Sequence, residues 1–443
     1  MTLTVLTAVV GDREAPLVTG LERSAVGVTV VRRCVDVLDL LSAAAAGLAH
    51  AVVLSAELQR LDRDAVTRLR MAGLAVIGLA SAGDQSGAER LSRLGVDPVL
   101  AADAPVEEIA LAVAAAVAEA AGQQASSSAG LVMGDPAGAL PRPPGPGPGP
   151  AVGASSPRSP GRLVTVWGPV GAPGRTTVAI TLASQLALAG HSTLLVDADT
   201  HGAGVAQALG LLDESAGIAA ATRAANQGAL DLNRLGELAP QVAPGLRVLT
   251  GLPQSRRWPE LRASALDVVW EQTRQLARWT VIDAGFGLET DEELMFDTTV
   301  PRRNAATLSA IAAADVVLAV GAAEPIGLQR LITALPEVKD RAGPGAVRVM
   351  VTRVRDGAVG PHAGQLITDA LRRYAGVHDV LLVPDDRPAL DAAMLHGRSL
   401  TEHAPASPAC RPFEVLAAAL NDEFNPGAAL PSRRRSRWRG RSA

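Results

Sequence analysis

A glycine-rich loop follows an apolar segment near the middle of this 443-residue chain. Residues 163–167 (LVTVW) predict a buried strand, residues 168–177 (GPVGAPGRTT) a loop, and residues 178–187 a helix. Glycines let backbone N–H groups converge on one anion, and a helix N-terminus adds unpaired donors and the positive end of its dipole. The pattern predicts a phosphate-binding loop with these contact residues: Gly168, Gly171, Ala172, Pro173, Gly174, Arg175, Thr176 and Thr177.

Two later apolar segments end in carboxylates that suit a Mg²⁺ site. Residues 192–199 end in Asp197 and Asp199, which lie two residues apart and therefore on one face of a strand. Residues 279–283 end in Asp283, which precedes two closely spaced glycines and resembles a Walker B aspartate. Because Mg²⁺ prefers oxygen ligands, we predict Thr176, Asp197 and Asp283 as its ligands, and Thr177 as a contact of the α-phosphate.

The elements that must position these residues alternate regularly. Before residue 122, apolar segments at 3–10, 28–31, 51–54, 75–79 and 98–100 alternate with helical patterns at 15–23, 35–45, 62–71, 87–94 and 106–121. Further apolar segments at 315–320, 347–352 and 380–383 extend the later sheet. Such alternation predicts parallel sheets with helices on both faces. The predicted fold class is α/β, with two doubly wound parallel-sheet domains, a (βα)5 domain and a larger P-loop NTPase domain.

A segment rich in Pro, Gly and Ser separates the two domains. It includes PRPPGPGPGP, a composition that cannot form a packed core and favours an extended tether. We expect ordered structure to stop near Ala121 and to resume near Leu163. The predicted organisation is a first domain at 1–122, a disordered linker at 123–162, a nucleotide-binding domain at 163–425 and a basic disordered tail at 426–443.

The composition excludes several classes of protein. Apolar residues make up 48% of the chain, which excludes global disorder. The only cysteines, Cys34 and Cys410, exclude a disulfide framework or a cysteine-rich metal site and favour a reducing compartment. No apolar segment is long enough for a bilayer, and no basic region precedes the N-terminal apolar segment as in a signal peptide. We therefore expect a cytoplasmic protein, at most peripheral on the inner face of the plasma membrane.

Residues 163–424 resemble the MinD/ParA class of P-loop ATPases. The deviant Walker A motif of that family corresponds to residues 170–177 (VGAPGRTT) and its Val-Asp-x-Asp segment to residues 196–199. The resemblance implies that Asp199 positions the attacking water. It also implies ATP and Mg²⁺ as cofactors, a nucleotide-dependent homodimer, and four further nucleotide contacts: Thr352, Arg353, Pro384 and Asp385.

The chain departs from that family at three positions. Val170 replaces the signature lysine that reaches across the dimer, Arg175 replaces the P-loop lysine, and Thr352 replaces an asparagine that meets adenine. A planar guanidinium differs from a compact ammonium, and losing a charge at the transition state is costly. We therefore predict binding of ATP–Mg²⁺ with slow or absent hydrolysis. Arg302 or Arg303 could replace the lost lysine, although a solvated loop is the preferred interpretation.

Residues 1–121 resemble a response-regulator receiver domain without its chemistry. Ser55 stands at the end of the third strand, where a receiver carries the phosphorylated aspartate, and Asp12 is the only acid near the end of the first strand. A degenerate receiver used for docking or dimerisation is therefore preferred over a phosphorylated switch. The fusion of such a module to the ATPase resembles the CpaE/TadZ proteins of tight-adherence pilus loci and actinobacterial septum-site-determining relatives of MinD.

The C-terminal segment Arg433–Arg441 is strongly basic in an otherwise acidic chain. It is expected to bind an anionic membrane surface, to touch nucleic acid, or to remain solvated, and DNA is the less favoured partner. The predicted function is a spatial regulator of septum placement or pilus assembly, with protein partners from a division or pilus machine. The alternatives are a non-hydrolysing scaffold of the TadZ type and a partition ATPase that binds DNA nonspecifically.

Overall fold

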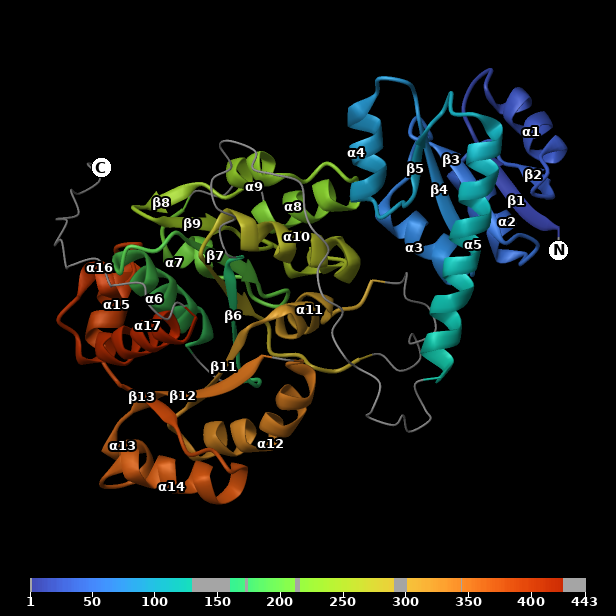
Figure 1. Cartoon of the computed structure of the whole chain (residues 1–443). Helices are drawn as coiled ribbons and strands as arrows, with labels where there is room; N and C mark the ends of the chain where they lie inside the picture. Colours follow the sequence, from blue (N-terminus) through green and yellow to red (C-terminus); the bar gives the residue numbers. More distant parts are fainter. Residues whose placement is uncertain are drawn as a thin grey trace, which may run out of the picture. The chain divides into compact units, whose positions relative to one another are not determined.

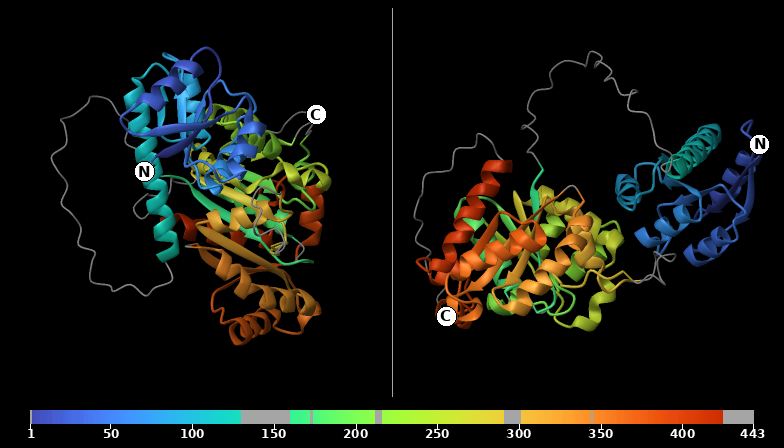
Figure 2. Two further views of the ribbon diagram at one scale, coloured as in Figure 1. Left: turned by 90° about the vertical axis from the view of Figure 1, so that its right-hand side faces the viewer. Right: turned by 90° about the horizontal axis from the view of Figure 1, so that it is seen from below.

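The computed structural model describes residues 2–129, 160–171, 174–211, 216–290, 301–343 and 345–424, with side chains only to residue 122 in the first range. The predictions for Ala172, Pro173, most of the linker and the basic tail lie outside the described residues. The chain forms two compact units, each a sheet with helices on both faces (Figure 1; Figure 2). Each unit is described below by itself.

The first unit is a five-stranded parallel sheet with the order β2-β1-β3-β4-β5. This is the strand order of flavodoxin-like folds. The strands are β1 (Leu3–Ala8), β2 (Val28–Arg33), β3 (Ala51–Ser55), β4 (Ala75–Ala80) and β5 (Val99–Ala101). The helices are α1 (Glu14–Arg23), α2 (Val37–Ala45), α3 (Arg63–Met71), α4 (Gln85–Arg93) and α5 (Val106–Ala129).

Alternating apolar side chains cover both faces of this sheet. On one face Val5, Val53 and Ile77 pack with α1 and α5, and on the other their neighbours Leu6 and Leu54 pack with α2, α3 and α4. Three of these helices begin at an aspartate whose side chain accepts a backbone N–H in the first turn: Asp36, Asp62 and Asp84. Such caps satisfy donors that the helix itself leaves unpaired.

Ser55 ends β3 with its side chain buried. Its hydroxyl accepts a hydrogen bond of 3.2 Å from the backbone N–H of Val10, in the loop that follows β1. Asp12 lies in the same loop and is exposed. Where a receiver would carry its aspartate, Ser55 therefore supplies a hydroxyl that accepts a hydrogen bond from the backbone of the neighbouring loop.

Helix α5 is longer than expected. We predicted that ordered structure would stop near Ala121, and the helix continues to Ala129. The added residues, 122–129 (GQQASSSA), contain one glycine and no proline, so nothing in them breaks the helix before the Pro/Gly-rich stretch begins. Across the described ranges, no helix is both long enough and apolar enough to cross a membrane.

The second unit is built on an eight-stranded sheet with the order β13-β12-β11-β6-β10-β7-β9-β8. All neighbouring strands are parallel except the edge pair β8 and β9. The strands are β6 (Arg162–Trp167), β7 (Thr193–Ala198), β8 (Gln241–Ala243), β9 (Leu246–Leu249), β10 (Trp279–Ala284), β11 (Val316–Ala322), β12 (Ala346–Val354) and β13 (Val380–Pro384). The two parallel sheets confirm the predicted fold class.

Helices cover both faces of this second sheet (Figure 1). Those of the first half are α6 (Arg175–Leu188), α7 (Val205–Ala208), α8 (Gly217–Asn226), α9 (Leu232–Leu238), α10 (Ala263–Leu276) and α11 (Ala305–Ala313). Those of the second half are α12 (Pro325–Arg341), α13 (Asp356–Val359), α14 (Ala363–Ala375), α15 (Arg387–Leu395), α16 (Leu400–His403) and α17 (Arg411–Phe424). Short 3₁₀ helices span Ser255–Glu260 and Pro408–Cys410.

The central strand β6 shows how the layers form. Val164 and Val166 face α6, α16 and α17, whereas Leu163 faces α8, α10 and α11 on the opposite side. At the amino end of the strand, Asp315 accepts hydrogen bonds from the backbone N–H of Leu163 (2.8 Å) and from Arg274 (2.6 Å). Burial on both faces and this anchor hold β6 in place, and so set the position of the loop that follows it.

Candidate functional site

The carboxyl edge of the second sheet brings the predicted phosphate loop and carboxylates together. The loop leaves β6, and β10, which ends near Asp283, lies between β6 and β7. In the register of β10 with β7, Asp283 is directly opposite Asp197. Parallel strands end at the same edge of a sheet, which is where α/β folds bind ligands.

Two glycines shape the loop. Gly171 has φ +72° and Gly174 has φ +106°, a backbone region that L side chains rarely adopt. Gly174 is also the N-cap of α6, and its carbonyl accepts the first helical hydrogen bond, from Val178, at 2.8 Å. The chain can therefore turn directly from the loop into the helix, with the helix N-terminus facing the sheet edge.

Arg175 lies at the centre of the site. Its guanidinium donates to the backbone carbonyl of Gly168 at 2.8 Å and pairs with Asp199 at 3.4 Å. The exposed fractions of the two side chains are 15% and 7%, so the pair is only weakly screened by water. The guanidinium also lies over the ring of Phe286, 5.8 Å from its centroid. This arginine therefore connects the glycine-rich loop to the end of β7.

Asp197 and Asp199 have their own hydrogen-bond partners. Asp197 accepts from the backbone N–H of Asp199 at 3.2 Å and of Val205 at 3.0 Å, and Asp199 accepts from His201 at 2.8 Å and Gly202 at 3.2 Å. Burial raises the pKa of Asp197 to about 7, although these backbone donors oppose the rise. Both side chains are held in fixed positions by the loop that follows β7.

Asp283 is buried with little compensation. Its side chain is fully buried, and neither oxygen makes a hydrogen bond of normal length and angle to any residue that the structure describes; the hydroxyl of Thr176 makes at most a weak one. Burial, followed by the charge of Asp197, raises the pKa of Asp283 well above that of an ordinary carboxyl group, while Thr176 and Arg175 oppose the rise. A buried carboxylate without a donor is costly, so this position calls for a cation or a proton.

These residues fit a Mg²⁺ ion that arrives with a phosphate ligand. In the described part of the chain, no three His, Cys, Asp or Glu side chains form a preassembled metal site. Mg²⁺ keeps several waters and commonly uses one or two carboxylates together with phosphate oxygens. The unsatisfied oxygens of Asp283 and the hydroxyl of Thr176, at the start of α6, are the ligands that such an ion would use.

A cluster beside the carboxylates was missed by sequence reasoning. The ring of His201 lies 4.4 Å from that of Phe286 and 3.3 Å from the side-chain oxygen of Asn304, and its other nitrogen lies 3.4 Å from the guanidinium of Arg303. The only sign of this cluster in the sequence is that His201 follows Asp199 by two residues. The cluster joins the loop after β7 to residues on both sides of the segment 291–300.

Arg303 does not lie in a solvated loop as preferred above. Besides its contact with His201, its guanidinium donates to the backbone carbonyl of Thr200 at 3.4 Å and lies 5.7 Å from the ring centroid of Trp258. Packing of α11 next to β7 brings Arg303, two residues before the helix, against the loop that carries Asp199. The guanidinium of Arg303 is therefore engaged by contacts within its own chain.

The four further residues predicted to contact the nucleotide lie at the ends of the neighbouring strands β12 and β13. Thr352 is buried beside the phosphate loop, since a Cβ added at Gly174 would lie 3.7 Å from its hydroxyl oxygen. Arg353 follows with a positive φ of 58°. The backbone N–H of Asp385, next to Pro384, donates to the carbonyl of Val354 at 3.1 Å. These four residues gather on the same edge as the loop, and their contact with a nucleotide stays a prediction.

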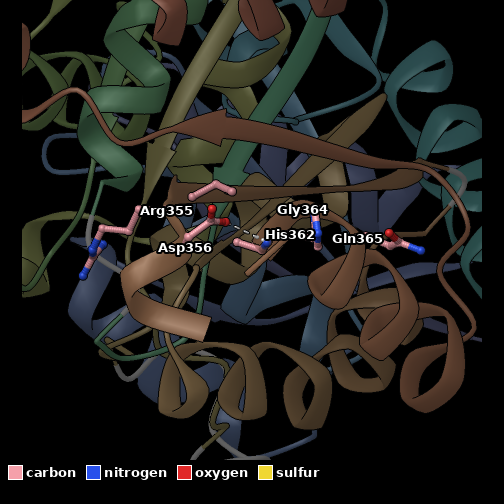
Figure 3. Close-up of a pocket in the computed structure, with 7 residues that line it drawn as sticks. Arg355, Asp356, His362, Gly364 and Gln365 are labelled. Carbon is pink, nitrogen blue, oxygen red and sulfur yellow. Dashed lines mark hydrogen bonds between the residues drawn. The ribbon is translucent and has the colours of Figure 1, made fainter. Parts of the chain in front are cut away.

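A pocket of about 570 Å³ opens near this end of β12 (Figure 3). It is lined by polar groups that sequence analysis had not singled out, Arg355, Asp356, His362 and Gln365, together with Val354, Ala363 and Gly364. Asp356 accepts a hydrogen bond of 3.0 Å from the backbone N–H of Ala363 and so fixes the start of α14. None of the predicted site residues lines this pocket, although Val354 and Arg355 of its lining directly follow Arg353 in the sequence.

No family model and no curated protein sequence matches this chain. Among solved structures, it resembles the cell division ATPase MinD of Pyrococcus furiosus (21% identity, 59% of this chain and 99% of that chain, TM-score 0.46). It also resembles the septum site-determining protein MinD of Pyrococcus horikoshii in complex with Mg-ADP (20% identity, 60% of this chain and 98% of that chain, TM-score 0.46). A ParA family ATPase from Chlorobium tepidum matches at 15% identity, over 58% of this chain and 98% of that chain, with a TM-score of 0.49. These are likenesses of fold, and the function proposed below rests on the geometry of the site.

Proposed function

We propose that the second unit binds ATP with Mg²⁺ at the carboxyl edge of its sheet. The observation that carries this proposal is the fully buried Asp283, whose oxygens make no hydrogen bond of normal geometry with the described residues, beside a glycine loop that opens a helix. The helix N-terminus and Arg175 favour a phosphate group. Thr176 and Asp283 supply oxygen ligands for the ion that accompanies it, and the ion supplies charge neutralisation at the phosphates.

Hydrolysis is proposed to be slow or absent. Asp199, which the MinD/ParA resemblance assigns to the attacking water, accepts two backbone N–H groups and pairs with Arg175. In this arrangement its oxygens are occupied, and Val170 offers no charge at the position of the family's signature lysine. Nucleotide-dependent dimerisation belongs to the same proposal.

The biological function proposed is that of a MinD/ParA-like spatial regulator, in which the ATP state controls where a septum or a pilus machine assembles. A scaffold that binds ATP without hydrolysing it is the second candidate, favoured by the engaged state of Asp199. Turnover separates the two, since a regulator that cycles must release phosphate. Salt-sensitive binding to DNA would instead favour a partition ATPase.

Isothermal titration of the full chain with ATP, with and without Mg²⁺, tests the proposal. Binding that requires Mg²⁺ is the expected result, and Asp283→Ala should remove the Mg²⁺ dependence. A phosphate-release assay on the same sample should give little or no turnover. Absence of ATP binding under both conditions contradicts the proposed site, and rapid phosphate release contradicts the proposed slow hydrolysis.

A further inference from the structure

An arginine from a distant helix contacts the phosphate loop. Arg330, on α12, donates a hydrogen bond of 3.1 Å from Nη1 to the backbone carbonyl of Val170. The same nitrogen lies so close to Gly171 that an added Cβ there would come within 2.2 Å of it. The guanidinium therefore lies directly against the loop backbone, 160 residues away in the sequence.

The position of Arg330 is set by the core beneath its helix. Leu328, Leu331 and Leu335 of α12 are buried against β11 and β12. Strand β11 is the direct neighbour of β6, from which the loop emerges. Because these contacts fix α12 relative to β6, the exposed side chain of Arg330 reaches the loop along the outer surface.

The guanidinium lacks the partner that it would bind most strongly. In the described ranges no carboxylate lies within ion-pair distance of Arg330, and a neutral carbonyl is its only hydrogen-bond acceptor. Hydrogen bonds from a guanidinium to a phosphate oxygen are roughly twice as strong as those to neutral acceptors. An oxyanion placed near the loop would therefore displace the carbonyl of Val170.

The charges around the loop also favour a second cation. Asp197, Asp199 and Asp283 surround the site, and Arg175 already pairs with Asp199. A triphosphate adds several further negative charges, of which Mg²⁺ cancels only two. The guanidinium of Arg330 is a cation that contacts the loop directly, at the carbonyl of Val170.

We propose that Arg330 is a phosphate-binding residue that α12 contributes to the site, and that it distinguishes a nucleoside triphosphate from a diphosphate. On binding, its guanidinium exchanges the carbonyl of Val170 for an oxygen of the terminal phosphate. This inference rests on the proposed function, since it requires that the loop binds a nucleotide. Bound triphosphate would thereby also connect α12 to the loop.

Titration of Arg330→Gln with ATP and with ADP, both with Mg²⁺, tests the inference. We expect the affinity for ATP to fall by about tenfold or more, and that for ADP by less than about threefold, because only the triphosphate offers the terminal group. Arg330→Lys keeps the charge but loses the planar guanidinium with its several N–H donors. Its affinity for ATP should lie between those of Arg330→Gln and the wild type. Arg341→Gln, at the other end of α12 and paired with Glu337, is the charge-matched control and should change neither affinity.

The outcomes separate this inference from the proposed function. Equal losses of ATP and ADP affinity in Arg330→Gln would show that the arginine only supports the loop, and unchanged affinities would show that it does nothing there. Either result overturns the inference while the nucleotide site stands. Failure of the wild type to bind ATP overturns the proposed function and this inference with it. Circular dichroism should show the same fold for all variants, because the side chain is exposed.

Discussion

Asp283 combines complete burial with the lack of any hydrogen bond of normal geometry to the part of the chain that the structure describes. Burial also raises the pKa of Asp197, to about 7. Without a ligand, the sheet edge therefore disfavours the charged forms of both Asp197 and Asp283. The folded chain then binds more protons than the unfolded chain between the ordinary carboxyl pKa, about 3.9, and the raised values. Stability therefore falls as the pH rises through this window, from about 4 to about 7.

The first prediction concerns Asp283→Asn. In Mg²⁺-free buffer the wild type should lose thermal stability between pH 5 and pH 8, and the variant should lose less, because one buried charge is gone. At pH 8 the variant should melt several degrees higher, since about 1 kcal/mol corresponds to 2–4 °C in a unit of this size. Calorimetry at both pH values measures this. A variant that melts below the wild type at pH 8 would count against the uncompensated charge.

The second prediction concerns Arg175. Arg175→Ala removes the contacts with Gly168 and Asp199 and should weaken ATP binding by about tenfold or more, because charge-assisted hydrogen bonds to phosphate are lost. Arg175→Lys should lose less, since it keeps the charge. Calorimetric titration gives both affinities. If Arg175→Ala binds ATP as the wild type does, this arginine is a structural residue only.

At the scale of elements, the junction of the loop with α6 depends on backbone conformation. Gly174 has φ +106°, yet a Cβ there would meet no atom closer than 3.7 Å. Space is therefore available, and only the conformation excludes other residues. By contrast, Gly357 in α13 has no positive φ and no atom within 4 Å of an added Cβ.

The third prediction follows from this pair of glycines. Gly174→Ala should cost about 1–3 kcal/mol of stability and weaken ATP binding, because the residue must leave its conformation or strain it. Gly357→Ala should be neutral or slightly stabilising, since alanine is the better helix former. Thermal unfolding and ATP titration of both variants check this. Equal behaviour of the two would mean that the positive φ is unimportant.

At the scale of the whole molecule, each unit has its own core. The first unit buries residues such as Val53 and Ile77 between its helices, and the second buries Val166, Leu182 and Trp270. Each core is large enough for independent folding, since single domains commonly span 50–200 residues or somewhat more. Every residue proposed to contact nucleotide lies in the second unit.

The fourth prediction is therefore that a fragment of residues 160–443 folds and binds ATP–Mg²⁺ with an affinity within about twofold of the full chain. The reason is that its core and its site are complete without the first unit. Circular dichroism and titration of the fragment beside the full chain measure this. A fragment that is folded but binds ATP tenfold more weakly would assign a part of the site to the first unit.

Much of the fold was predictable from local patterns. Apolar segments of strand length, helix caps such as Asp62 and the glycines of the loop are properties of neighbouring residues, so the strands of the first unit and the loop-helix junction at Gly174 appear in the sequence. Strand β9, Leu246–Leu249, was not among the predicted apolar segments. Its end nevertheless closes the site, since a Cβ at Gly251 would meet Asp197 at 2.6 Å.

The sequence by itself determined the two parallel sheets, the glycine-rich loop before α6 and the carboxylates at the strand ends, because chain periodicity and residue type set each of them locally. Only the tertiary structure decided that Asp283 makes no hydrogen bond of normal geometry with the described residues, that Arg175 pairs with Asp199, and that Arg330 lies on the loop. These features depend on how helices and strands distant in sequence pack, and burial and electrostatic pairing follow from that packing.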